Sequence, residues 1–134
     1  MTKRRFTIKE DLYDAEILVF VGYRYEAMKK IVEREGAKKG ITYEWDEDDI
    51  EYYNTCDGAY LHLDASNKTT IRILWLDTWE QNIEGMVLIS HETEHAAYEI
   101  MQDRNVDYSN ESEEAFIRYH GVLLKRCLTK LWRA

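Results

Sequence analysis

The alternation of apolar and polar residues predicts a strand and then a helix in the first part of the chain. The run from Ala15 to Gly22 is apolar, rich in β-branched residues and of strand length. From Arg24 to Glu35 the apolar side chains recur at helical spacing, and Gly36 is the expected stop of that helix. The polar and acidic stretch from Lys38 to Thr55 shows no period that assigns it. The first part of the chain therefore contributes one strand and one helix to the predicted fold.

The second part of the chain predicts a β-hairpin followed by two helices. Ala59–Leu63 and Thr69–Leu76 have strand patterns and flank the turn-rich segment Asp64–Lys68, which predicts a hairpin. From about Asn82 to Asp103 the apolar residues recur on one helical stripe, and a last helix is expected from about Glu111 to Trp132. The order strand, helix, hairpin, helix, helix predicts an α+β fold.

The bulk composition is that of an ordinary globular protein. A length of 134 residues, with 45% hydrophobic and 33% charged residues, predicts one domain over residues 1–134. No run of about eighteen apolar residues occurs, and the basic Met1–Phe6 segment is not followed by an apolar core, so neither a membrane span nor a signal peptide is expected. Cys56 and Cys127 are isolated and are expected to be reduced core residues. A cytoplasmic location follows from these features.

The net charge of −8 disfavours a nucleic-acid partner, because proteins that bind phosphates need a positive face. Basic residues cluster only in short pairs, namely Lys29-Lys30, Lys38-Lys39 and Lys125-Arg126. The densest charged run is acidic, Asp46–Asp49 followed by Glu51, and is interpreted as a solvated loop.

The candidate chemistry lies in the motif His91-Glu92-Thr93-Glu94-His95, inside the helix expected from Asn82 to Asp103. The spacing of four residues puts both imidazoles on one helix face, about 6 Å apart along the axis. From there both rings reach one Zn²⁺. Glu92 follows the first histidine and is placed to take a proton from a water molecule held by the metal. A chance match in a chain of this size is on the order of one in a hundred, and the competing interpretation is a surface helix with two solvated histidines.

A catalytic zinc ion needs a third protein ligand, and the sequence narrows its type. The extended motif with a third histidine requires a glycine and a histidine where Tyr98 and Met101 stand, so that class is excluded. A carboxylate from the last helix is the remaining option, and three acids open that helix: Glu111, Glu113 and Glu114. Glu111 lies in the expected first turn, where an acid favours the helix dipole whether or not a metal is near.

The choice between Glu113 and Glu114 depends on the face of the last helix. Asn110 and Glu113 have the spacing of a capping box, which gives Glu113 a structural role. Glu114 shares a face with Ile117 and Gly121, and the glycine allows another helix to pack closely there. We expect this face to lie against the motif helix. Glu114 is therefore the predicted third ligand and Glu113 is the alternative.

Five further residues near the motif have weaker interpretations. His120 falls on a different helix face from the predicted ligand and is expected to have a polar, partly buried role. Tyr119 has a hydroxyl able to bind an oxyanion, although a packed aromatic is the favoured interpretation. Tyr98 shares the face of the first histidine as core or cleft wall, and Asp103 and Asp107 are candidates for orienting a ligand histidine.

At His91–Ala97, and again at Glu113–Phe116, the chain resembles the zincin superfamily. It looks like minimal gluzincins, which include small phage- or prophage-encoded proteins with this motif, and is more distantly similar to SprT-like and ImmA/IrrE-like peptidase domains. The resemblance covers roughly Thr69 to Gly121 and implies a minimal zincin-like domain. It also implies that the strand before the motif helix, Ile71 to Leu76, is an edge strand that lines the cleft and pairs with an extended peptide.

The same resemblance implies that His91, His95 and Glu114 bind zinc and that Glu92 is the general base. The leading hypothesis is therefore a cytoplasmic zinc metallopeptidase acting on a peptide or protein. The alternative is a catalytically idle zinc-binding module with a regulatory or interaction role. A third class, an amide hydrolase like peptide deformylase with a cysteine ligand upstream, is ranked low because the residues around Cys56 do not match that enzyme's cysteine motif. The oligomeric state is left open.

Overall fold

The structure, a computed structural model, describes residues 2–45 and 50–133 and confirms the predicted α+β class. The acidic run interpreted as a solvated loop, residues 46–49, lies outside the described residues. The elements that the structure assigns are β1 (Arg4–Glu10), β2 (Ala15–Val21), α1 (Tyr25–Lys38), α2 (Ile50–Asn54), β3 (Gly58–Asp64), β4 (Thr70–Leu76), α3 (Ile83–Asp103) and α4 (Glu113–Leu131). The two elements that the sequence pattern did not predict are β1 and α2.

The described strands form one sheet in the order β1-β2-β4-β3. Strand β2 pairs with β4 in parallel, with Leu18 opposite Ile73, whereas β3 pairs with β4 antiparallel, with Leu61 opposite Ile73. The hairpin predicted from the two strand patterns is thus confirmed. Its turn includes Lys68 at a φ of 65°, and the last strand pair before the turn is Asp64 with Thr70.

The prediction that β4 is an edge strand is wrong. Its residues Ile73–Leu76 pair with β2 on one side and with β3 on the other, and residues 72–76 are all buried. A continuous buried run of this kind is typical of a strand covered on both faces. Over this span β4 has neighbours on both edges, so an extended substrate has no open edge of β4 to pair with. The outermost of the described strands are β1 and β3.

The chain gathers into two compact units. The first comprises Met1–Phe6 and Ile17–Trp79, and the second comprises Thr7–Glu16 and Glu80–Ala134. Strands β1 and β2 contribute residues to both units. The single domain expected over residues 1–134 stays a prediction, and each unit is described separately below.

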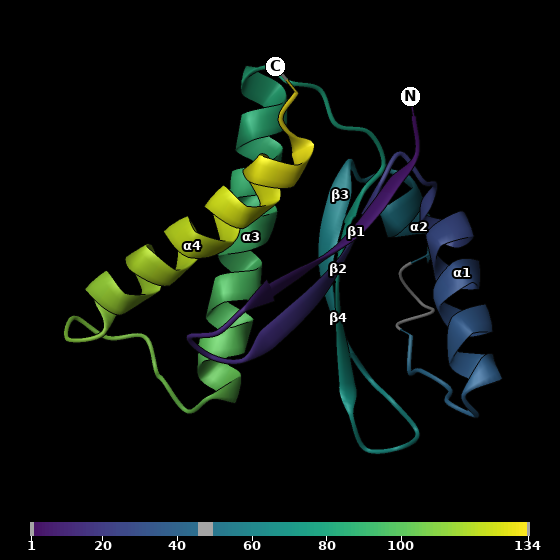
Figure 1. Cartoon of the computed structure of the whole chain (residues 1–134), viewed down its shortest axis with the longest axis horizontal. Helices are drawn as coiled ribbons and strands as arrows, with labels where there is room; N and C mark the ends of the chain where they lie inside the picture. Colours follow the sequence, from purple (N-terminus) through teal and green to yellow (C-terminus); the bar gives the residue numbers. More distant parts are fainter. Residues whose placement is uncertain (1, 46–49, 134) are drawn as a thin grey trace. The chain divides into compact units, whose positions relative to one another are not determined.

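In the first unit, α1 lies along one face of the strands (Figure 1). The buried core that they share consists of Phe20, Tyr25, Met28, Val32, Leu61, Leu63, Ile73 and Trp75. The prediction that Gly36 stops this helix is wrong, because α1 continues to Lys38. Gly36 instead allows the backbone of Ile41 to pack closely against α1, because a Cβ on Gly36 would lie 2.8 Å from the carbonyl oxygen of Ile41. The left-handed residue after the helix is Gly40, at a φ of 71°.

In the second unit, α4 crosses α3 (Figure 1), and the turn end of the β1–β2 hairpin completes the unit. Both helices bury one apolar stripe. Its members are Ile89, Ala96, Ala97, Ile100 and Met101 from α3, and Phe116, Tyr119, Leu123, Cys127 and Leu131 from α4. None of the described helices is both long enough and apolar enough to cross a membrane.

Candidate metal centre

Helix α3 carries the motif and begins where the sequence predicts. The side chain of Asn82 caps it, because its Oδ1 accepts a hydrogen bond from the backbone N–H of Gly85 at 2.9 Å. Glu84 puts an acid in the first turn, which the helix dipole favours. The helix then runs without interruption to Asp103, so the two histidines four residues apart lie on one face.

The imidazoles of His91 and His95 point their Nε2 atoms at each other. These two atoms are 3.1 Å apart, and the ring planes are nearly perpendicular at 88°. Two nitrogens that bind one tetrahedral zinc ion at about 2.0–2.1 Å lie about 3.3 Å from each other. Both side chains are exposed, so an ion can reach them from solvent. The pair therefore fits a zinc ion with little rearrangement.

Glu92 lies beside this pair but in a different environment. Its Oε1 is 3.8 Å from Nε2 of His91, and the ligand atoms of the three residues lie within 4.8 Å of one another. The Glu92 side chain is 7% exposed, whereas that of His91 is 62% exposed. Burial restricts the rotamers of the carboxylate, while the histidines face the solvent. The three side chains therefore form a group that could hold a metal ion.

The packing argument for Glu114 is wrong. The Glu114 carboxylate accepts a hydrogen bond from Nε of Arg118 at 3.1 Å, and its side chain is 69% exposed. The other members of the predicted contact face are also exposed: Ile117 is 58% exposed, and a Cβ on Gly121 would meet nothing within 4 Å. Helix α4 instead buries its apolar stripe, because burying those larger side chains removes more apolar surface from water. Glu114 as a zinc ligand stays a prediction, without this support.

The structural role predicted for Glu113, in a capping box with Asn110, is also wrong. Helix α4 begins at Glu113 with Ser112 at the N-cap, so the capping box that was predicted from Asn110 to Glu113 does not form. The Ser112 hydroxyl donates to the carbonyl oxygen of Asp107 at 2.6 Å instead. Glu113 interacts with the phenol of Tyr108: loss of hydration, and then the negative charge of Glu113, raise the pKa of Tyr108 above its ordinary value.

An aromatic cluster connects the start of α4 to the histidine face of α3. The ring of Tyr98 lies 4.9 Å from that of Phe116 and 5.4 Å from that of Tyr108, between ring centroids. Tyr98 follows His95 by three residues, so the two are neighbours on the α3 surface. The cluster thus packs Tyr108 and Phe116 against Tyr98 of α3. Tyr98 is half-buried, and its assignment to the wall of a cleft stays a prediction.

His120 ties α4 to the turn of α3 that holds the motif. Its Nε2 lies 3.0 Å from the carbonyl oxygen of Ser90 and 3.0 Å from Oγ1 of Thr93. Because a carbonyl oxygen only accepts, Nε2 carries the hydrogen and donates. The Thr93 hydroxyl in turn donates to the carbonyl oxygen of Ile89 at 2.7 Å. The predicted polar, partly buried role of His120 is confirmed.

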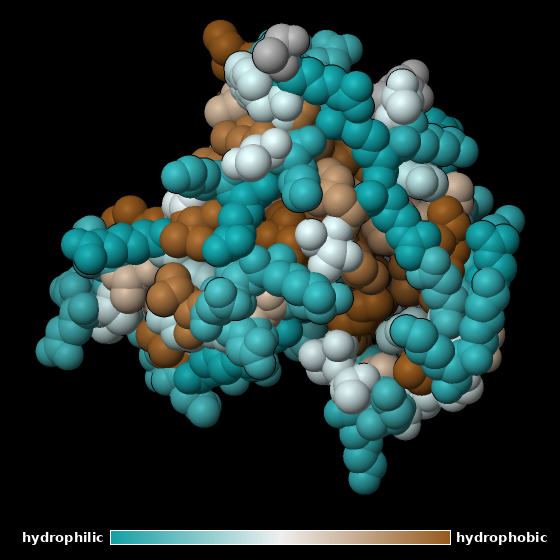
Figure 2. All heavy atoms as spheres, in the orientation of Figure 1, coloured by the Kyte–Doolittle hydropathy of each residue, from teal (hydrophilic) through white to brown (hydrophobic). Residues whose placement is uncertain are grey.

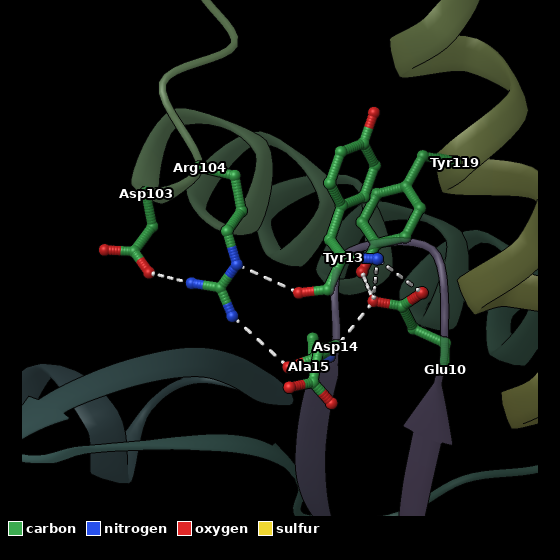
Figure 3. Close-up of polar contacts among 7 residues, drawn as sticks. All are labelled: Glu10, Tyr13, Asp14, Ala15, Asp103, Arg104 and Tyr119. Atoms are coloured by element: carbon green, nitrogen blue, oxygen red, sulfur yellow. Dashed lines mark hydrogen bonds and ion pairs between the residues drawn. The ribbon is translucent and has the colours of Figure 1, made fainter.

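Tyr119 is buried, and its hydroxyl binds a carboxylate of the same unit. It donates to Glu10 at 2.5 Å, and the backbone N–H groups of Tyr13 and Ala15 donate to the same side chain at 3.2 Å (Figure 3). The favoured interpretation of Tyr119 as a packed aromatic is confirmed. Glu10 is the residue that sequence reasoning missed. The sequence signal that could have identified Glu10 is its two-residue spacing from Phe6 and Ile8, which puts all three side chains on one face of β1.

Of the two aspartates proposed as orienting groups, Asp103 is the last residue of α3 and Asp107 lies within the loop that leads to α4. Asp103 accepts a hydrogen bond from Nη1 of Arg104 at 2.7 Å, and Nε of that arginine donates to the carbonyl oxygen of Tyr13 at 2.9 Å (Figure 3). Asp107 contributes its backbone carbonyl to Ser112. Their role in orienting a ligand histidine stays a prediction.

Comparison of the chain with protein-family models, curated proteins and solved structures yields no match. The candidate centre therefore rests on the motif and on the geometry of His91, Glu92 and His95.

Proposed function

We propose that the chain is a zinc-dependent hydrolase, of the metallopeptidase type that its motif resembles. The observation that carries the proposal is the pair of Nε2 atoms 3.1 Å apart, with the buried Glu92 carboxylate beside them. Chance surface histidines at this spacing have no need of an adjacent buried acid, because burying a carboxylate costs free energy. The substrate proposed is a peptide or protein.

His91, His95 and Glu92 have distinct roles in this proposal. His91 and His95 would hold the ion through Nε2. A bound zinc ion supplies Lewis-acid activation of a water molecule and of the substrate carbonyl. Glu92 accepts the proton that the water loses and returns it to the leaving amine, a transfer that needs a carboxylate held in place. Its burial provides that fixed position.

The third ligand is proposed to be one of the two acids that open α4. Glu114 is the choice from the sequence, and it would have to leave an exposed contact with Arg118, which costs little. The contacts of the second unit give more support to Glu113. It is an exposed residue in the first turn of α4, and it interacts with Tyr108, whose ring lies 5.4 Å from that of Tyr98 on α3.

One observation favours the alternative of a zinc-binding module without catalysis. The strand expected to pair with an extended substrate, β4, has neighbours on both edges. A peptidase of this kind would have to hold its substrate by other contacts. Measuring zinc content and hydrolysis together separates the two functions.

The test is to measure zinc content by mass spectrometry and hydrolysis of unfolded casein for the wild type, Glu92→Gln and Glu94→Gln. Glu94 is the exposed acid two residues on and is the matched control. We expect all three proteins to retain zinc, and only Glu92→Gln to lose hydrolysis, by a factor of about 100 or more. Zinc retained without hydrolysis in the wild type contradicts the peptidase and supports the module. A wild type that binds no zinc contradicts both.

A cytoplasmic location is part of the proposal. Cys56 and Cys127 are both free thiols, which is typical of proteins in reducing compartments.

The described group of candidate ligands contains two imidazoles and a carboxylate, so it gives no support to a deformylase-like centre with a cysteine ligand.

A further inference from the structure

A groove of about 490 Å³ lies in the second unit, away from the candidate metal centre. Strand β1 contributes Thr7, Ile8 and Lys9 to it, and α4 contributes the face between Val122 and Lys130. This volume is within the range of about 300–1,000 Å³ that binding sites occupy. On the face seen in Figure 2, hydrophilic and apolar side chains alternate over α4.

The groove is basic although the chain is acidic. Four of the residues that line it are cations, Lys9, Lys125, Arg126 and Lys130, and none is an acid. Lys9 pairs with Glu16, whose Oε2 lies 3.9 Å from Nζ of Lys9, with both side chains more than half exposed. The formal net charge of the chain is −8, so this concentration of positive charge is the reverse of the average surface. It favours an anionic partner.

The shape of the groove favours an extended partner. Successive residues of a strand point to opposite faces, so three consecutive lining residues mean that the groove borders the edge of β1. Among the described strands β1 has one neighbour, β2, which leaves its other edge open. Ile8 and Val122 add an apolar floor. An open strand edge beside an apolar floor is the setting for strand addition.

We propose that this groove binds an acidic peptide segment in extended form. The peptide backbone pairs with the edge of β1, and its carboxylates contact the cations of α4. A nucleic acid fits less well, because the described lining has no aromatic ring on which bases stack. The proposal is independent of zinc and of hydrolysis.

The test is fluorescence polarisation with a labelled peptide of alternating glutamate and valine, about eight residues long, the length of a common strand. Glu92→Gln protein is used throughout, so that hydrolysis of the probe does not interfere. The groove variant Lys125→Glu/Arg126→Glu is compared with Lys38→Glu/Lys39→Glu, an exposed pair in the first unit with the same change of charge.

We expect the groove variant to weaken peptide binding at least tenfold and the control pair to change it less than about threefold, with binding that falls as salt is raised. A Lys9→Glu variant is expected to weaken binding in the same direction. Equal losses in both double variants would show a response to net charge alone and would overturn the proposal. Tighter binding of a single-stranded oligonucleotide of equal charge would overturn it as well.

Discussion

Nε2 of His120 donates to the carbonyl oxygen of Ser90 at 3.0 Å, and Ser90 is the residue immediately before His91. The contact joins α4 to the turn of α3 from which the first candidate ligand projects. A second contact of the same nitrogen, to Thr93, holds the next turn. Helix α4 therefore contacts the motif-bearing part of α3 at Ser90 and Thr93.

Replacing His120 with alanine is expected to lower the free energy of unfolding by about 1–2 kcal/mol, because two half-buried hydrogen bonds between helices are lost. Urea unfolding followed by circular dichroism measures the change. His62→Ala, at an exposed histidine of β3, is the control and is expected to change stability by less than about 0.5 kcal/mol. Equal effects of the two substitutions would contradict the role given to His120.

The buried carboxylate of Glu10 is predicted to be essential for the stability of the second unit. Glu10→Ala leaves two backbone N–H groups and the Tyr119 hydroxyl without their shared acceptor, and is expected to cost about 3 kcal/mol or more. Tyr119→Phe removes one of these bonds and is expected to cost about 1–3 kcal/mol. Glu16→Ala, at an exposed acid of the same hairpin, is the control in urea unfolding. A wild-type midpoint for Tyr119→Phe would show that the bond contributes nothing.

Two single substitutions are predicted to show which acid, Glu113 or Glu114, is the third zinc ligand. We expect Glu113→Ala to weaken zinc binding at least tenfold, and Glu114→Ala to leave it within about threefold, in competition with a chelator of known affinity. The zinc affinity of His91→Ala gives the decrease expected when an assigned ligand is lost. The reverse result would restore Glu114, and wild-type affinity in both variants would exclude the start of α4 as the source of the ligand.

Cys127 is predicted to be unreactive in the folded chain. Burial raises the pKa of its thiol to about 12, so at pH 8 the reactive thiolate is almost absent. We expect iodoacetamide to modify the half-buried Cys56 first, and Cys127 only after denaturation, as read by mass spectrometry of the peptides. Modification of both at one rate in the folded protein would contradict the buried position.

The same shift predicts a loss of stability at high pH. In the unfolded chain the Cys127 thiol loses its proton near its ordinary pKa of 9.0, whereas in the folded chain it keeps the proton until about pH 12. Above pH 9 the unfolded state therefore binds fewer protons, and the contribution of this thiol to stability falls as pH rises. Cys127→Ala is expected to reduce the fall, measured as urea midpoints from pH 8 to pH 11.

The elements that the sequence predicted correctly are those whose signals are local. The hairpin of β3 and β4 follows from two strand-like runs around a turn-rich segment, and α3 follows from an apolar stripe at helical spacing. Because helix spacing alone puts His91 and His95 on one face, the candidate ligand pair was also predictable. These features depend on neighbours a few residues apart, which the linear pattern records.

Tertiary structure alone decided the rest. Strand β1 was missed because its in-phase positions include Arg4 and the buried Glu10, and burial of Glu10 depends on the hydroxyl of Tyr119, 109 residues away. The pairing of β4 on both edges and the face of α4 that meets α3 likewise depend on distant partners. A local pattern shows which positions are apolar, but not which element covers them. For that reason the sequence alone determined the histidine pair, while the choice of a third carboxylate depends on how α4 packs.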